Sequence, residues 1–165
     1  MDDVAIAGAG PAGSLAAAIL ARAGLRVRIF ERARFPRPKL CGDTLNPGAL
    51  SVVQRHFDVA PLLEASDPIT GMLLTGPGGV RVRGEYGEGI TGRAITRSVL
   101  DQWLLERAVE AGASVEHDVV VRDVAMNDGR IAGVMTGGRA GALTHPARLV
   151  IAADGRRSAI AIGRG

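Results

Sequence analysis

The first thirty residues alternate apolar runs with Gly-rich and Arg-rich positions, and this pattern predicts a strand, a helix and a second strand. Val4–Ala7 is an uninterrupted apolar run of the kind found in central parallel strands. A helix is expected over residues 11–23, with Gly24 as its left-handed cap. Residues 25–31 then alternate apolar side chains with Arg, as a half-buried strand does. The apolar face of the helix is expected to contain Leu15, Ile19 and Leu20.

The stretch Val4–Ala21 carries no charge, which raises the alternatives of a membrane span and a signal peptide. A membrane span needs about 20 mainly apolar residues, whereas this stretch consists mostly of Ala and Gly. A signal peptide begins with basic residues, whereas this chain begins with Asp2 and Asp3. Both alternatives are therefore disfavoured, and a nucleotide-binding turn remains.

The segment "GAGPAG" satisfies the Gly-x-Gly-x-x-Gly pattern of dinucleotide-binding turns. In that pattern Gly8 permits the tight turn, Gly10 lets the backbone approach a pyrophosphate, and Gly13 lets the helix lie close to the strand. Pro11 suits the first helical turn, where its missing N–H has no intrahelical partner to lose. The helix then directs its N-terminal N–H groups toward the anion.

Glu31 ends the second predicted strand, eighteen residues after Gly13. An acidic side chain at this place accepts hydrogen bonds from a ribose diol and repels a 2′-phosphate. Strand, Gly triad, helix and acid in this register predict a βαβ dinucleotide cradle.

Beyond residue 45 the pattern predicts further helices and strands. The expected helices cover 46–57 and 98–111, and a hairpin is expected over 71–84. Strands are expected over 114–124 and 130–136, joined by a turn at Asn127-Asp128-Gly129, and a last apolar strand over 147–153 ends in a turn at Asp154-Gly155. The predicted fold class is therefore α/β, with a Rossmann-like parallel sheet plus a β-meander.

The charge pattern leaves two interpretations open. The net charge is +3, and the twenty basic residues comprise nineteen Arg and Lys39 alone. Seven of them lie between Arg22 and Lys39, where they could face phosphate groups or form a solvated surface. Nucleic acid is not an expected partner, because aromatic residues make up only 3% of the chain and no recognition motif is present.

A single cysteine, Cys41, excludes an intrachain disulfide and a Cys-based zinc cluster. The three His residues are scattered without ligand spacing, so no metal site is expected. A reducing, cytoplasmic setting fits this composition.

Three segments together resemble the first half of flavoproteins of the para-hydroxybenzoate-hydroxylase type. They are the N-terminal cradle, "AITRSVLDQWLLERAVEAGASV" and "LVIAADGRRS". The loop "FPRPKLCGDTLNP" is similar to the Lys-x-Cys-Gly loop of the geranylgeranyl-reductase family, which includes isoprenoid-quinone reductases. The resemblance covers essentially the whole chain and implies FAD as the cofactor.

The resemblance also implies a set of FAD-binding residues. Four positions of the Gly-rich turn would line the pyrophosphate, with Pro11 beside them, and Glu31 would bind the adenosine ribose. Arg32 and the backbone of Val121 would lie near the adenine, and Arg97 near the phosphates. Cys41 and Gly42 would lie beside the flavin ring, and Asp154 and Gly155 would hold the ribityl and pyrophosphate region. The four positions of the turn are Gly8, Gly10, Ala12 and Gly13.

The implied function is that of a FAD-dependent oxidoreductase with NAD(P)H as electron donor. It could be a reductase of an isoprenoid or a quinone, with peripheral membrane contact, or a monooxygenase or halogenase acting on an aromatic substrate. No catalytic acid or base stands out. Two rivals remain open: a non-catalytic module that holds only the ADP half of FAD, and an NAD-dependent dehydrogenase, which does not need the Cys41 loop.

The family continues with a large substrate domain that is largely missing from these 165 residues. Residues 1–165 are therefore expected to form the FAD-binding domain of a longer architecture. Residues 68–95 are expected to be strands of a truncated substrate-domain sheet, with the hairpin at 71–84 exposing apolar surface.

Overall fold

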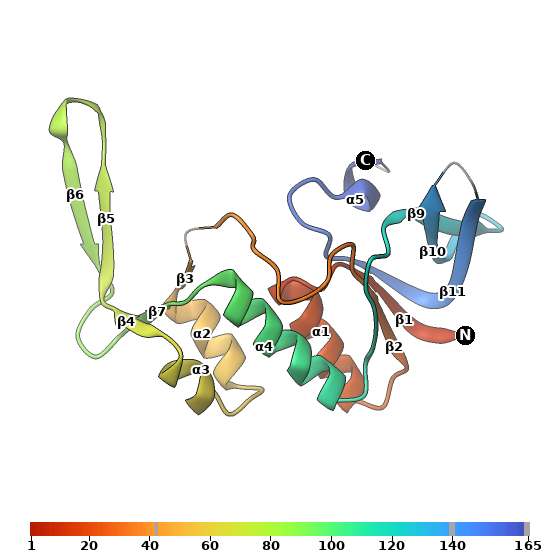
Figure 1. Cartoon of the computed structure of the whole chain (residues 1–165), viewed down its shortest axis with the longest axis horizontal. Coiled ribbons are helices and arrows are strands. Elements are labelled where there is room, and N and C mark those ends of the chain that lie inside the picture. The colour runs from red at the N-terminus through yellow and green to blue at the C-terminus, as the bar shows by residue number, and fades with distance from the viewer. Residues whose placement is uncertain (42, 139–140, 164–165) are drawn as a thin grey trace. The chain divides into compact units, whose positions relative to one another are not determined.

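A computed structural model describes residues 1–41, 43–138 and 141–163, which form two compact units (Figure 1). The first unit consists of residues 1–37 and the part of the chain from 101 onward, and the second of residues 38–100. Gly42, one of the predicted flavin neighbours, lies outside the described residues.

The first unit is built on a six-stranded sheet with the order β8-β2-β1-β11-β10-β9. Strands β8, β2, β1 and the C-terminal half of β11 run parallel, whereas β9, β10 and the N-terminal half of β11 form an antiparallel meander. The predicted parallel sheet and meander are thus both present, and β11 belongs to both. The strand bounds are Asp2–Ala7 for β1, Val27–Phe30 for β2, Ser114–Glu116 for β8, Val121–Asn127 for β9, Arg130–Gly138 for β10 and Gly141–Ala152 for β11.

The helix α1, Pro11–Arg22, buries a different face from the predicted one. Ile19 is 37% exposed, and neither Leu15 nor Leu20 is fully buried. Small side chains allow the helix to approach the sheet closely, so its packing face excludes the large apolar residues. The buried residues are Gly13, Ser14, Ala17 and Ala18.

The predicted strand over 114–124 was wrong, because the structure divides it into β8 and β9 at opposite edges of the sheet. Strand β8 pairs in parallel with β2, whereas β9 pairs antiparallel with β10. Between them Asp118 adopts a left-handed backbone conformation with φ 61°. The chain therefore turns at Asp118, inside a segment whose pattern predicts one strand.

The remaining helices and strands lie largely in the second unit. Helix α2 ends three residues earlier than expected, and Asn46 Oδ1 caps it by accepting from the Ala49 N–H at 2.8 Å. Helix α4 begins in this unit and continues into the first. The bounds are Pro47–Gln54 for α2, Ala60–Glu64 for α3, Arg97–Glu110 for α4, Thr44–Leu45 for β3, Asp67–Ile69 for β4, Gly71–Thr75 for β5, Arg81–Glu85 for β6 and Gly92–Ala94 for β7, and the short helix α5 in the first unit covers Ala159–Gly163.

The hairpin β5–β6 stands as a two-stranded sheet whose apolar side chains are exposed. Leu74 pairs with Val82, and the two are 63% and 56% exposed. Strands β3, β7 and β4 form a separate three-stranded sheet, in which the Arg93 guanidinium donates to Ser66 Oγ at 2.8 Å. Within the described residues, no helix is long and apolar enough to cross a membrane.

Candidate nucleotide-binding site

Three strand ends meet at one edge of the parallel sheet. Gly8 follows β1, Glu31 follows β2, and Ala153 follows β11. The Gly8 N–H donates to the Phe30 carbonyl at 2.8 Å, and the Ala153 N–H donates to the Ala7 carbonyl at 2.8 Å. Because the chain leaves β1 toward β2 on one side and returns to β11 on the other, this edge is the crevice where open α/β sheets bind ligands.

Two glycines permit the close approach of backbone segments at this edge. Gly8 has φ +97°, and a Cβ built on it would lie 2.5 Å from the Ala153 carbonyl oxygen. A Cβ on Gly13 would lie 2.0 Å from the Gly8 carbonyl oxygen. Both distances are far shorter than any real Cβ contact, so the predicted packing roles of these two glycines agree with the structure.

The N-terminus of α1 begins directly after this turn. Gly10 is the N-cap with an extended backbone, Pro11 is the first helical residue, and no side chain caps the helix. Ser14 Oγ donates instead to the Ala9 carbonyl at 2.9 Å, which braces the turn from the buried side. The first N–H groups of a helix have no intrahelical acceptor, so those of Ala12 and Gly13 can bind an anion.

Glu31 is joined to the turn by its buried carboxylate. Oε2 accepts from the Ala9 N–H at 2.7 Å, and Oε1 accepts from the Ala33 N–H at 3.0 Å. The residue is only 4% exposed, whereas its neighbour Arg32 is exposed. A carboxylate has about four lone-pair positions, so Glu31 retains acceptor capacity beside the Gly-rich turn.

Asp154 contributes an acceptor without a partner. Its Oδ2 accepts from the Ala159 N–H at 2.8 Å, whereas Oδ1 is buried and has no hydrogen-bond partner within the described ranges. The Cα of Asp154 would lie 2.9 Å from a Cβ on Gly8, so the carboxylate belongs to the same edge. Gly155 follows with φ +95°. A buried carboxylate oxygen that lacks a donor indicates a site for a ligand hydroxyl or amide.

The other predicted residues are distributed over both units. Val121 is 8% exposed and shares a core cluster with Phe30 and Ala7, which places it near the same edge. Cys41 and Arg97 lie in the second unit, where Cys41 is exposed and the Arg97 N–H donates to Asp43 Oδ1 at 3.2 Å. The structure thus brings together the Gly-rich turn, Glu31, Val121 and Asp154 in the first unit.

The Arg cluster is largely neutralised by carboxylates. Arg26 donates to Asp3, whose pKa is held well below its usual range by hydrogen bonds from the Arg26 side chain and backbone. The pKa of Arg28 is raised, chiefly by its hydrogen bond to Glu116 at 2.7 Å. Further ion pairs join Arg34 to Asp118, and Arg37 to Glu31 and Asp101. Arg26 and Arg34 remain largely exposed while paired, as a solvated surface predicts, whereas Arg37 is mostly buried between two carboxylates.

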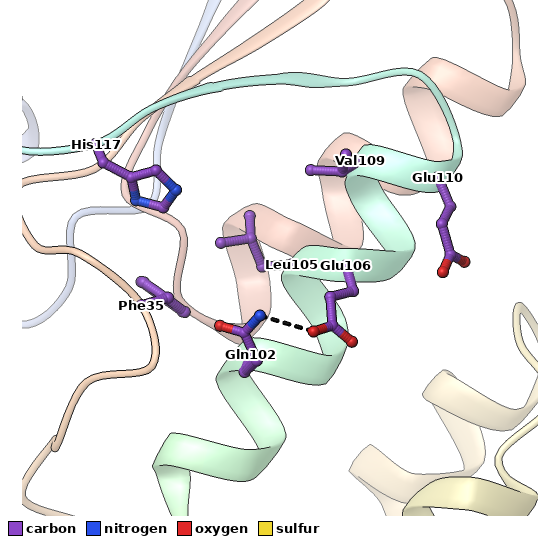
Figure 2. A pocket seen from close by; sticks show the side chains of 7 residues that line it. All are labelled: Phe35, Gln102, Leu105, Glu106, Val109, Glu110 and His117. Atoms are coloured by element: carbon purple, nitrogen blue, oxygen red, sulfur yellow. Dashed lines mark hydrogen bonds between the residues drawn. The ribbon is translucent and has the colours of Figure 1, made fainter.

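A pocket of about 270 Å³ lies along α4 (Figure 2). Figure 2 shows Gln102 hydrogen-bonded to Glu106 on the helix, with Phe35 and His117 on the facing loops. None of the predicted site residues lines it, and the described part of the chain holds no cluster of three metal-ligating side chains. The lining residues are Phe35, Gln102, Leu105, Glu106, Val109, Glu110 and His117.

Comparison with known protein families agrees with the geometry of the strand-end edge. Residues 1–164 match the family of FAD-binding domains. The chain belongs to this family. Its cofactor is FAD, as the resemblance implied.

The FAD-binding domain has curated relatives that are reductases. It is 40% identical over 162 residues to digeranylgeranylglycerophospholipid reductase 1 of Methanopyrus kandleri, an alignment that covers 96% of this chain and 40% of the relative. It is 36% identical over 161 residues to the menaquinone reductase of Mycolicibacterium smegmatis, with 96% and 38% covered. The chain spans about two fifths of the length of these relatives.

Solved structures share the fold of the domain. A geranylgeranyl bacteriochlorophyll reductase-like protein from Thermoplasma acidophilum has a TM-score of 0.74 and 28% identity, covering 93% of this chain and 39% of that one. The flavin-dependent halogenase CmlS has a TM-score of 0.77 and 27% identity, covering 99% and 30%. The parallel sheet with its meander is therefore the fold of known flavoproteins.

FAD fits the residues of the strand-end edge. Gly8 and Gly13 permit a close packing of the turn that a Cβ would prevent, and the α1 N-terminus supplies N–H donors for a pyrophosphate. Asp154 Oδ1 lacks a donor that a ligand hydroxyl can supply. Sequence reasoning missed the ion pairs of Arg37 with Glu31 and Asp101. An Asp on the buried side of α4 was a visible signal of a buried charge, but it does not show which residue is its partner.

Replacing Glu31 with Ala is expected to weaken FAD binding by about 1.5–3 kcal/mol, roughly 10- to 150-fold, because a hydrogen bond to a charged group is lost. Quenching of flavin fluorescence during titration measures the affinity. Glu116→Ala is the matched control, since Glu116 ends the neighbouring strand β8 and pairs with Arg28 instead. Equal FAD affinity in Glu31→Ala and the unaltered chain would remove Glu31 from the site.

Proposed function

We propose that this chain is the FAD-binding portion of a flavin-dependent reductase that acts on an isoprenoid lipid or a quinone. The observation that carries the proposal is the set of groups at the strand-end edge: the Gly-rich turn, the α1 N-terminus, the Glu31 carboxylate and the unpartnered Asp154 Oδ1. The choice of reductase is supported by the identity to a digeranylgeranylglycerophospholipid reductase and a menaquinone reductase.

Different residues of the first unit would bind different parts of the cofactor. The N–H groups at the start of α1 would bind the pyrophosphate, and Glu31 would accept from the adenosine ribose. Asp154 would accept from a hydroxyl of the ribityl chain and so satisfy its buried oxygen. When bound, FAD supplies the hydride-transfer chemistry, whereas the protein supplies binding and orientation. Arg32, Arg97 and Val121 are proposed as further contacts to the adenine and phosphates.

Residues 68–95 are proposed to belong to a substrate-binding sheet. They lie in the second compact unit, and the hairpin β5–β6 exposes apolar side chains on strands that two-stranded pairing alone stabilises poorly. Lipid substrates favour contact with a membrane surface. The chain has a single cysteine, the exposed Cys41, which is compatible with a reducing, cytoplasmic compartment. NAD(P)H is proposed as the electron donor.

A second candidate is a flavin-dependent halogenase or monooxygenase acting on an aromatic substrate. It is favoured by the 27% identity to the halogenase CmlS over 99% of this chain. The two candidates differ in the substrate and in whether the reduced cofactor meets a double bond or dioxygen, so turnover with each substrate class distinguishes them.

The visible absorption spectrum of the purified chain, with the released cofactor identified by mass, tests the proposal. A flavin spectrum with FAD recovered is the expected result. A colourless protein that binds ADP but not FAD would favour a module that holds only the ADP half. Binding of NAD without FAD would favour a dehydrogenase.

Replacing Cys41 with Ala is expected to leave the melting temperature unchanged, because the side chain is exposed. The proposed position of Cys41 beside the flavin predicts a shift in the flavin absorption maximum without loss of FAD. An unshifted spectrum would remove Cys41 from the flavin environment. Unchanged substrate turnover in the variant would exclude a chemical role for the thiol.

A further inference from the structure

Arg37 occupies a position between two buried carboxylates of the first unit. Its Nε lies 3.6 Å from Glu31 Oε1, and its Nη2 lies 3.4 Å from Asp101 Oδ2. The Arg37 side chain is 14% exposed, whereas the side chains of Glu31 and Asp101 are 5% and 0% exposed. The three groups come from the end of β2, the loop after it and helix α4.

This arrangement determines the charge balance around Glu31. Buried charged groups in proteins are paired with counter-charges and hydrogen-bond donors. Arg37 lies within ion-pair distance of both acids, and its guanidinium carbon lies 4.7 Å from the centre of the Phe35 ring. Because the guanidinium lies over the Phe35 ring, it is held by packing as well as by charge.

Each oxygen of the Glu31 carboxylate already accepts one hydrogen bond from the protein backbone. The Ala9 N–H binds Oε2 from the Gly-rich turn, and the Ala33 N–H binds Oε1 together with the charge of Arg37. The Nε donor of Arg37 is buried and has no acceptor within hydrogen-bond distance among the residues described. The ion pairs of the guanidinium are with carboxylate oxygens of Glu31 and Asp101. The Arg37 side chain therefore faces these two acids rather than solvent.

We propose that Arg37 is a positioning residue for ribose recognition: it holds the Glu31 carboxylate in an orientation in which its remaining lone pairs accept from the nucleotide ribose. The inference rests on the proposed function, in which Glu31 binds the ribose. Asp101 is the second anchor of the guanidinium and fixes it from α4. A direct phosphate contact by Arg37 is the alternative, and it is disfavoured because two carboxylates already neutralise the guanidinium.

The experiment compares the affinities of the 165-residue chain for ADP and 2′-deoxy-ADP by titration calorimetry. The ratio of the two dissociation constants reports recognition of the ribose 2′-hydroxyl and is expected to be about tenfold or more in the unaltered chain. Arg37→Gln is expected to bring this ratio close to the value of Glu31→Ala. Arg34→Gln is the matched control, because Arg34 lies in the same loop but is 75% exposed and pairs with Asp118. Its ratio is expected to stay unchanged.

The double variant Arg37→Gln/Asp101→Asn covers the case in which Arg37→Gln does not fold, because it removes one buried negative charge along with the guanidinium. It is expected to show the same reduced ratio. A ratio equal to that of the unaltered chain in either folded variant would overturn the positioning role and leave the proposed function standing. Equal loss of affinity for both ligands, with a weaker salt dependence, would overturn it in favour of direct phosphate contact. Absence of ADP binding, or an unchanged ratio in Glu31→Ala, would overturn the proposed ribose site and this inference with it.

Discussion

Replacing Gly8 with Ala is expected to abolish FAD binding and to lower the free energy of unfolding by roughly 2–6 kcal/mol. Two effects add at this position. The backbone has φ +97°, which strains any residue with a Cβ, and that Cβ would meet the Ala153 carbonyl oxygen at 2.5 Å. The colliding atoms are backbone atoms of the next strand end, so no side-chain rotation can relieve the contact. Chemical denaturation and FAD titration measure the two effects.

Gly24→Ala is the matched control for this prediction. Gly24 also has a positive φ, +84°, but a Cβ there would meet nothing within 4 Å. Only the conformational strain of about 1–2 kcal/mol is therefore expected, with FAD affinity retained. If Gly8→Ala bound FAD as well as Gly24→Ala does, the close approach at Gly8 would have no role in the site.

Replacing Phe30 with Ala is expected to lower the free energy of unfolding by about 3–5 kcal/mol, the usual cost of emptying a buried Phe site. Phe30 is 1% exposed, packs in one cluster with residues of β9, β10 and α5, and has its ring centre 4.6 Å from that of His145. A loss of this size is a large share of the 5–15 kcal/mol typical of a domain. Urea denaturation followed by circular dichroism measures it.

The exposed Leu143 on β11 provides the control for Phe30. Leu143 is 66% exposed, so Leu143→Ala is expected to change the free energy of unfolding by no more than about 0.5 kcal/mol. A loss below about 1 kcal/mol in Phe30→Ala would mean that the cluster between β2 and the meander contributes little to the fold.

The dinucleotide cradle was predictable from the sequence because its signals are local. The Gly-rich turn, Pro11 and Glu31 lie within one strand–helix–strand unit, and the structure has α1 and β2 within a few residues of their expected bounds. The positive φ at Gly24 likewise follows from its place at the end of a helix. Short-range spacing therefore determined this part of the fold and of the candidate site.

What depends on pairing between distant segments was not predictable. The run over 114–124 has strand character throughout, and only its partners decide that it divides between β2 and β10. The buried face of α1 depends on how closely the sheet approaches it, which hydrophobicity alone does not report. Likewise, the loop sequence gives no sign that Arg37 pairs with Asp101 on a helix far along the chain.

Strand β11 gives the cradle an unusual order of assembly. Its register pairs Ala7 with Ala152. The third segment of the cradle, Ala153 and Asp154, therefore joins the segments after β1 and β2 from a distant part of the chain. Closing so long a loop is entropically slow, and parallel pairings of this kind form late in folding. During synthesis the Gly-rich turn therefore reaches its complete shape only after β11 has been made. A cofactor that contacts all three segments can then be bound only once β1 and β11 have paired.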